Sequence, residues 1–263
     1  VWSRSGRVLA WSVLGMLVGI VYGLPIAMIA LASIAGQWNG ALPSHLTLGN
    51  YAAALGGDPG HQLKVSVITG ILASLAALVL GSWAALALRH MATVPKRILD
   101  LLFFIPSAVP SVSVGLGLLV AFSQRPVLLN GTVLIVLLAH FILISAFTYG
   151  NVSAGLARIA PEYEQMAASL GARPAYRLWH VLLPLMRPYL LAAFSLSFAL
   201  SRGELGATVM VYPPGWVTLP VGIFALTDRG DVFQGAALTM ILTATTLAVL
   251  IALALVPNKA AAR

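Results

Sequence analysis

Two groups of polar side chains in this sequence could do chemistry, and both interrupt long apolar runs. Arg202 and Glu204 lie in "SRGELGATVMVYPPGW", and the basic stretch "SLGARPAYRLWHVLLPLMRP" runs from Ser169 to Pro188. Charged groups inside a membrane usually face a water-filled path or pair with one another. Residues at positions i and i+2 do not share a helix face, so we expect separate partners for Arg202 and Glu204. The two residues predict a translocation gate, and the alternative is a pair of interfacial charges just outside the lipid.

The other polar residues do not form a catalytic or metal-binding pattern. The chain has no cysteine, and its five histidines are scattered rather than set at the spacing of metal ligands. It also lacks the phosphate loop G-x-x-x-x-G-K-[ST] and the motifs H-E-x-x-H and G-x-S-x-G. We therefore expect no catalytic residue, no metal and no cofactor in this chain. His140 is the one histidine inside an apolar run, and we interpret it as a packed, hydrogen-bonded side chain.

The composition indicates a protein that is solvated by lipid. Hydrophobic residues make up 60% of the 263 positions and charged residues 8%, whereas a soluble domain carries about 25% charged residues. So few charges could not cover the surface of a water-soluble domain. The pI near 10.3 could suggest nucleic acid as a partner, but the positions of the basic residues favour a membrane topology signal instead.

Six segments are long and apolar enough to span a bilayer, which takes about 20 residues per helix. They predict an all-α integral membrane bundle that forms a single domain over residues 1–263. Arg4 and Arg7 before the first segment are also typical of a cleaved signal peptide, but the apolar run is too long for one. The predicted spans are Val8–Ala35, Leu63–Leu88, Ile98–Phe122, Gly131–Tyr149, Pro188–Val211 and Val232–Val256.

Lysine and arginine are strongly biased toward one side of this six-span topology. Cytoplasmic segments of membrane proteins carry the excess of basic residues, so we expect both termini in the cytoplasm. The opposite side holds Lys64, Arg125, Arg202 and Arg229. The cytoplasmic side receives Arg4, Arg7, Arg89, Lys96, Arg97, Arg158, Arg173, Arg177, Arg187, Lys259 and Arg263.

Two outer segments have a mixed character. Gly36–Gln62 is polar and punctuated by Gly and Pro, and it predicts an external loop with a short helix around Asn50–Leu55. Tyr212–Asp231 opens with paired prolines, which prevent a helix from continuing. Its apolar part, Leu219–Thr227, is too short to span, so we expect an interfacial or re-entrant helix with Trp216 at the headgroup level.

The segment Arg158–Arg187 predicts a compact elbow of two short helices. Pro161 suits the first turn of a helix over Glu162–Leu170, and Gly171 suits its end. A second helix is predicted over Ala175–Leu183, ending at Pro184. On composition alone the alternative is an ordinary cytoplasmic loop whose arginines only set the topology.

The order of residues in the elbow resembles the "EAA" loop of permease subunits of binding-protein-dependent ABC importers of type I. That pattern is Glu-Ala-Ala, three residues, Gly, nine residues, Ile, any residue and Leu-Pro. Here Gly171 is followed by nine residues and then by Val-Leu-Leu-Pro, whereas Gln-Met-Ala stands where Glu-Ala-Ala is expected, with Glu164 one position early. The resemblance implies a coupling helix that docks on a separate ATPase, carried by Glu164, Gln165, Met166, Ala167, Ala168, Gly171, Val181, Leu183 and Pro184.

The resemblance extends over nearly the whole chain. "LTLGNYAAAL" and "IPSAVPSVSVGLGLL" resemble further elements of the family, and "GELGAT" resembles its sulfate, molybdate, ferric-iron and phosphonate branches. The continuation "MVYPPGWVTLPVGIFALTDRGD" looks most like permeases for 2-aminoethylphosphonate. The implied cargo is a small anionic or zwitterionic solute, with 2-aminoethylphosphonate preferred. Ferric iron, sulfate, molybdate and thiamine stay open as alternatives.

The same resemblance implies partners and a location. We expect two copies of an ATPase that bind ATP and Mg, a second permease chain, identical or different, and an extracytoplasmic substrate-binding protein. We expect the bacterial inner membrane, with lipid and no nucleic acid as partners. A self-contained secondary transporter or channel is a rival that would explain the intramembrane charges but not the elbow. A membrane enzyme is a weaker rival, since no constellation of nucleophile, base and metal supports it.

Overall fold

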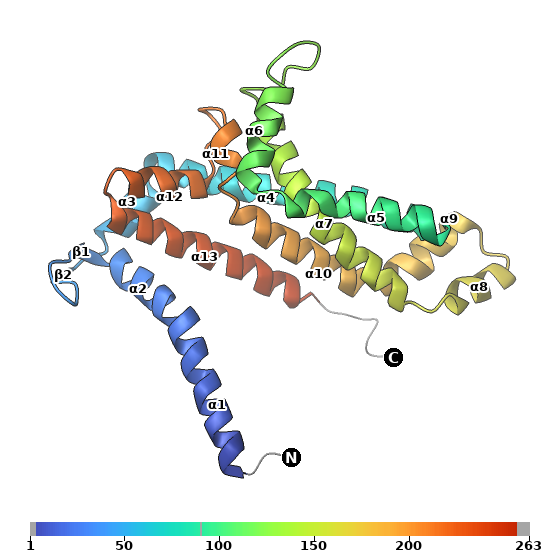
Figure 1. The fold of residues 1–263 in the computed structure, drawn as a ribbon, viewed down its shortest axis with the longest axis horizontal. Coiled ribbons are helices and arrows are strands. Elements are labelled where there is room, and N and C mark those ends of the chain that lie inside the picture. The colour runs from blue at the N-terminus through green and yellow to red at the C-terminus, as the bar shows by residue number, and fades with distance from the viewer. Residues whose placement is uncertain (1–3, 90, 257–263) are drawn as a thin grey trace. The chain divides into compact units, whose positions relative to one another are not determined.

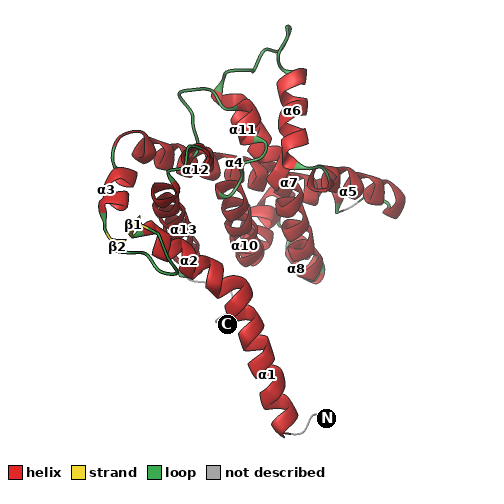
Figure 2. Cartoon of the chain, turned by 60° about the vertical axis from the view of Figure 1, so that its left-hand side comes forward, coloured by secondary structure: helices red, strands yellow, loops and turns green. Residues whose placement is uncertain are grey.

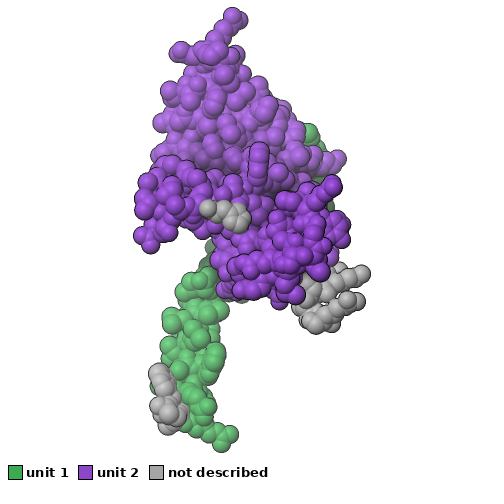
Figure 3. Space-filling model, turned by 90° about the vertical axis from the view of Figure 1, so that its right-hand side faces the viewer, with its two compact units in different colours: residues 1–61, 222–244 green, residues 62–221, 245–263 purple. Residues whose placement is uncertain are grey.

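A computed structural model describes residues 4–89 and 91–256, and helices make up most of this part of the chain (Figures 1 and 2). The predicted cytoplasmic charges Lys259 and Arg263 lie outside the described residues. The chain divides into two compact units, one of residues 1–61 and 222–244 and one of residues 62–221 and 245–263 (Figure 3). The second unit contains the elbow and both charges of the predicted gate.

The first span is one long apolar helix within the first unit. It runs through α1 (Arg4–Val18), the π-helical turn η1 (Gly19–Gly23) and α2 (Leu24–Ser33). Its membrane-compatible part, Gly6–Ser33, agrees with the predicted Val8–Ala35 to within two residues at each end.

A small hairpin follows the first span and was not predicted from the sequence. Strands β1 (Ala35–Gln37) and β2 (His45–Leu46) pair antiparallel, and α3 (Gly49–Leu55) confirms the short helix expected in this loop. The side-chain amide of Asn50 donates hydrogen bonds to the carbonyls of Ser33 and Ala35, at 3.0 and 2.9 Å. These bonds tie α3 to the end of the first span.

The second, fourth and sixth spans are confirmed as continuous helices. They are α4 (Gly57–Leu88), α7 (Val133–Arg158) and α13 (Val232–Ala254). Both α4 and α7 extend past the predicted spans, α4 at its start and α7 at its end. The short apolar helix predicted over Leu219–Thr227 is also present, as α12 (Leu219–Asp228).

The third span is not the straight helix that we predicted over Ile98–Phe122. It consists of α5 (Thr93–Ala108) and α6 (Ser111–Ala121), which meet at an angle of 100° (Figure 1). Val109 and Pro110 between them have extended backbone conformations. Because proline disfavours a helical conformation in the residue before it, the break is placed at Val109.

The fifth span differs from the prediction at both ends. The second elbow helix does not stop at Pro184, because α9 (Pro174–Arg177) and the π-helical turn η2 (Leu178–Leu182) lead directly into α10 (Leu183–Arg202). The N–H of Leu183 donates to the carbonyl of Leu178, so the helix is locally widened just before Pro184. Proline is tolerated in the first turn after such a change of hydrogen-bonding pattern.

The outer end of this span lies nine residues earlier than the predicted Val211. Gly203 follows the last helical residue, Arg202, and a separate short helix, α11 (Thr208–Val211), comes after it. Glu204 is therefore outside the spanning helix. The chain from Tyr212 to Thr218 is not helical, which confirms the effect expected of the paired prolines.

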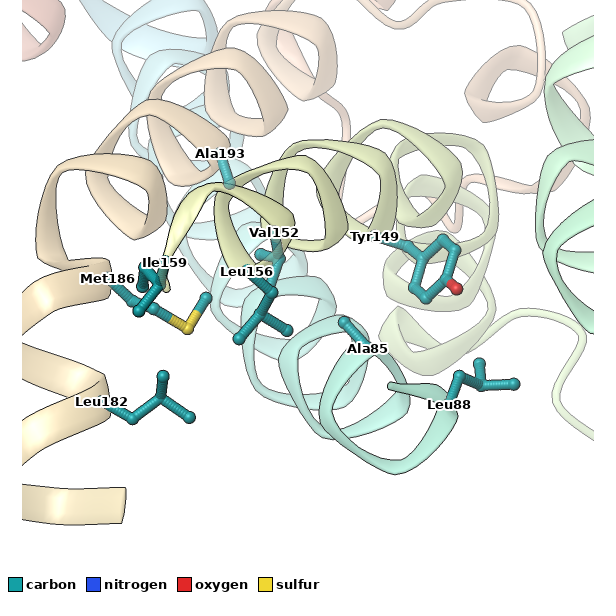
Figure 4. Packing of buried hydrophobic residues seen from close by; sticks show 9 residues of the cluster. All are labelled: Ala85, Leu88, Tyr149, Val152, Leu156, Ile159, Leu182, Met186 and Ala193. Atoms are coloured by element: carbon teal, nitrogen blue, oxygen red, sulfur yellow. The ribbon is translucent and has the colours of Figure 1, made fainter. Parts of the chain in front are cut away.

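The main core of the second unit lies where the end of α4, the second half of α7 and the start of α10 meet. The predicted topology places this region toward the cytoplasm. Figure 4 shows this cluster, which contains Leu156 and Ile159 from the end of α7 and the residue after it, Leu182 from η2 and Met186 from the start of α10. Tyr149 is also part of it, stacks on Phe103 of α5 and donates a hydrogen bond to the carboxylate of Asp100. The core therefore holds both helices from which the elbow emerges.

We predict that Gly115→Ala destabilises the protein and that Gly117→Ala on the same helix does not. A Cβ at Gly115 would lie 2.7 Å from the carbonyl oxygen of Ala207, whereas no atom lies within 4 Å of one at Gly117. Overpacking of this kind costs about 1–3 kcal/mol of unfolding free energy. Denaturant or thermal unfolding in detergent measures the difference, and equal stability of the two variants would contradict the close approach of α6 and α11.

Candidate functional site: the elbow and the gate

The first leg of the elbow is a short helix that ends as the sequence predicts. Helix α8 (Glu162–Ser169) carries Glu162 and Glu164 in its first turn, which suits the positive end of the helix dipole. Gly171 has a φ of +82°, in the left-handed region that glycine adopts without a steric cost. The N–H groups of Gly171 and Ala172 donate to the carbonyls of Ala168 and Ala167, at 2.9 and 3.0 Å. This is a Schellman motif, and it reverses the chain between the two legs.

An ion pair connects the elbow to a different span. Arg89, directly after α4, pairs with Glu164 of α8 through Nη1 and Oε1, and both side chains are mostly buried. Glu164 lies one residue before the position of the family glutamate, and Gln165 at that position is exposed. The structure therefore gives a role to Glu164 that its sequence offset did not reveal: it fastens α8 to the end of α4.

The nine residues predicted to couple to an ATPase divide between the two legs. Glu164, Gln165, Met166, Ala167 and Ala168 lie on α8, and Gly171 forms the turn. Val181 lies in η2, while Leu183 and Pro184 begin α10. No loop therefore separates the second leg from the spanning helix α10.

The outer face of the elbow is apolar, which sequence reasoning did not single out. Leu170, next to the turn, is 89% exposed, and Tyr163, Met166 and Tyr176 are also exposed. Ala167, Leu170 and Tyr176 line a hollow of about 420 Å³ at the turn. The sequence does contain a feature that could have revealed this face: large apolar residues lie in a segment that the charges place outside the lipid.

Arg202 is buried at the last residue of α10 and is held by hydroxyl groups rather than by an acid. Its side chain is 2% exposed. Its Nη2 donates to Oγ1 of Thr245 at 2.7 Å and its Nε to Oγ1 of Thr246 at 3.4 Å, both on α13. Its Nη1 has no hydrogen-bond partner in the described part of the chain. The guanidinium thus fastens the end of α10 to α13.

Glu204 has a separate partner, as the i, i+2 spacing predicts. One carboxylate oxygen accepts a hydrogen bond from the backbone N–H of Ala207 at 2.7 Å, just before α11. Glu204 also lines a cavity of about 200 Å³ at the break between α5 and α6, together with Ser107, Ser111 and His140. The carboxylate therefore positions α11 and borders a cavity of mixed polar and apolar lining beside the broken span.

His140 is a packed histidine, which confirms the interpretation from the sequence. It is 2% exposed, and its Nδ1 and Nε2 form hydrogen bonds with the hydroxyls of Ser201 and Thr208, at 2.7 and 2.9 Å. The ring connects α7 to α10 and to α11. Within the described ranges, His, Asp and Glu form no group of three or more that could hold a metal ion.

Comparison with known sequences identifies close relatives. The family described as "Binding-protein-dependent transport system inner membrane component" matches residues 77–259. A protein of Salmonella paratyphi A, named as a candidate 2-aminoethylphosphonate transport system permease protein, PhnV, is 56% identical over 247 residues, covering 94% of this chain and 93% of its own. The molybdenum transport system permease protein ModB of Mycobacterium tuberculosis is 34% identical over 160 residues, covering 56% and 60% of the two chains.

Solved structures share the fold over almost the whole chain. A bacterial ABC transporter that imports the acidic polysaccharide alginate has a TM-score of 0.74 at 14% identity, and the match covers 95% of this chain and 94% of that one. A second alginate transporter structure, in complex with a periplasmic protein that holds an alginate pentasaccharide, has a TM-score of 0.75 at 13% identity, covering 95% and 93%. At this identity the likeness establishes the fold alone.

We predict that reversing either charge of the Arg89–Glu164 pair loosens the elbow and that reversing both restores it. Arg89→Glu and Glu164→Arg each place like charges together, and the double variant re-forms the pair with opposite polarity. A coupling of about 1 kcal/mol corresponds to about fivefold faster hydrogen exchange of the α8 amides in each single variant. Additive effects in the double variant would show that the two side chains do not interact.

Proposed function

This chain belongs to the family of binding-protein-dependent transport system inner membrane components, and from this premise we propose that it carries 2-aminoethylphosphonate as the permease subunit of an ABC importer. The observation that supports this cargo is the 56% identity to PhnV over 94% of the chain. The ModB match is shorter and less similar, so molybdate is a weaker assignment. A phosphonate with an amino group also agrees with the expected small, zwitterionic cargo.

We propose that the elbow docks on a separate ATPase subunit, two copies of which bind ATP and Mg for the transporter. The support is the exposed apolar face around Leu170, which would cost free energy in water unless another protein covered it. The Schellman turn at Gly171 gives this face a fixed shape, and Glu164 anchors it to α4 through Arg89. Gln165, Met166, Ala167, Ala168, Val181, Leu183 and Pro184 are the other coupling residues.

We propose that the second partner is another permease chain and the third a substrate-binding protein on the outer side. The alginate transporter in complex with a periplasmic protein supports this last partner by analogy of fold. The distribution of lysine and arginine supports an orientation with both termini and the elbow in the cytoplasm. Cargo would then enter from the side opposite the elbow.

The proposed cycle uses the direct connection between elbow and spans. ATP binding closes the ATPase dimer and draws the two elbows together, and each elbow moves α10 because η2 continues into it without a loop. The gate at Arg202 and Glu204 lies at the far end of the same helix. Arg202 is bonded to α13 and Glu204 to the start of α11, so a shift of α10 would move both elements together. Hydrolysis of ATP by the partner resets the elbow.

The test is ATP-driven uptake by the transporter purified with its partners and reconstituted in liposomes. We expect a P-loop ATPase at one copy per permease chain and uptake of labelled 2-aminoethylphosphonate that molybdate does not suppress. Gly171→Val forces a β-branched residue into the left-handed region, at about 1–2 kcal/mol. We expect it to lower uptake by about tenfold, while the ATPase continues to hydrolyse ATP.

Two control variants separate coupling from backbone strain. Gly171→Asn should keep most of the uptake, because asparagine adopts the left-handed conformation more readily than valine. Gly131→Val introduces a similar strain at a φ of +75° in another loop and should leave coupling intact. Normal uptake in Gly171→Val would contradict the role of the elbow, and uptake that needs no ATPase would favour a secondary transporter.

A further inference from the structure

A second cavity in this unit lies between the end of α4 and the elbow and has no place in the proposed cycle. Its volume is about 390 Å³. Trp83 and Leu86 of α4 and Leu178 of η2 form apolar parts of its wall, and Arg89, Arg177 and Glu164 form the polar part. The cavity is therefore amphipathic, because both cationic and hydrocarbon side chains line it.

The topology proposed above places the cavity at the boundary between lipid and water. The span of α4 ends at Leu88, one residue before Arg89, and the fifth span begins at Pro174, three residues before Arg177. Trp83, one helical turn inside the end of α4, is 71% exposed. Tryptophan with an exposed ring is typical of the headgroup region, so the apolar wall faces acyl chains and the arginines face headgroups.

The polar part of the cavity wall has an excess of positive charge. Glu164 is paired with Arg89, while Arg177 forms no ion pair among the residues that the structure describes. The Nε of Arg177 is buried and has no hydrogen-bond partner within the same residues. A buried N–H without an acceptor costs free energy, and an anionic oxygen would satisfy it with a charge-assisted bond.

We propose that this cavity binds an anionic phospholipid, with its phosphate on Arg177 and Arg89 and its glycerol and upper acyl carbons against Trp83, Leu86 and Leu178. A lipid fits better than free phosphate, because most of the residues that line the cavity are apolar and it lies at the end of two spans. The inference rests on the topology proposed above, which places these ends at the cytoplasmic leaflet, where anionic lipids attract basic groups. The lipid would bridge α4 and the elbow beside the Arg89–Glu164 pair.

The test measures lipid retention by the complete transporter in nanodiscs of phosphatidylcholine and phosphatidylglycerol. After extraction, native mass spectrometry counts the lipid molecules that stay bound. We expect retained phosphatidylglycerol in the wild type and about tenfold less in Arg177→Gln, a loss equivalent to one charge-assisted hydrogen bond. Arg177→Lys keeps the charge and should keep most of the lipid, which shows that the site still folds.

The matched control is Arg97→Gln, which removes an exposed arginine of α5 on the same predicted side. It should retain phosphatidylglycerol like the wild type. The proposal would be overturned if Arg177→Gln retained as much phosphatidylglycerol as the wild type. It would also be overturned if the wild type retained as much phosphatidylcholine as phosphatidylglycerol. Displacement of the lipid by inorganic phosphate would also overturn it and assign the cavity to that occupant. Retention is read without transported cargo, so failure of the lipid site and failure of the proposed import function are distinguishable.

Discussion

Close packing of α7 against α10 is the interaction on which the rest of this structure depends. A Cβ at Gly155 of α7 would lie 2.5 Å from Cγ of Tyr189 on α10, so only glycine permits this approach. The hydroxyls of Thr148 and Ser197 form a hydrogen bond of 2.6 Å farther along the same pair of helices. The elbow connects these two helices, so their contact fixes the distance between its legs. The two legs would then move together as one rigid element.

Polar groups inside the bundle serve mainly to join helices to one another. An unpaired polar group in lipid costs free energy. In this bundle, hydroxyl groups of Ser and Thr form hydrogen bonds with the buried polar side chains described above. Ser201 and Thr208 hold both nitrogens of His140, and Thr245 and Thr246 hold Arg202. These contacts link α7, α10, α11 and α13 near the proposed gate. The far end of α10 is therefore joined to α7, α11 and α13 by side-chain contacts, and these would move with α10 in the proposed cycle.

The sequence predicted those features whose cause is local. Apolar runs located the spans, Gly171 located the turn of the elbow, and the prolines after Tyr212 located the break before α12. The continuation of the helix through Pro184 could not be predicted, because it depends on a π-helical turn in the preceding residues. The partners of Arg202 and Glu164 lie on α13 and directly after α4, 43 and 75 residues away. Their identity follows from tertiary packing and leaves no local signature.

The central claim is that the face around Leu170 is where a separate ATPase transmits work to the spans. The chain has no cysteine, so Leu170→Cys introduces a single site for a thiol-linked photo-crosslinker. Thr132→Cys, exposed in the loop before α7, is the control. We expect irradiation of the complete transporter to join the chain to its ATPase from position 170 and not from position 132. An intact, transporting complex without a cross-link from position 170 would contradict the account.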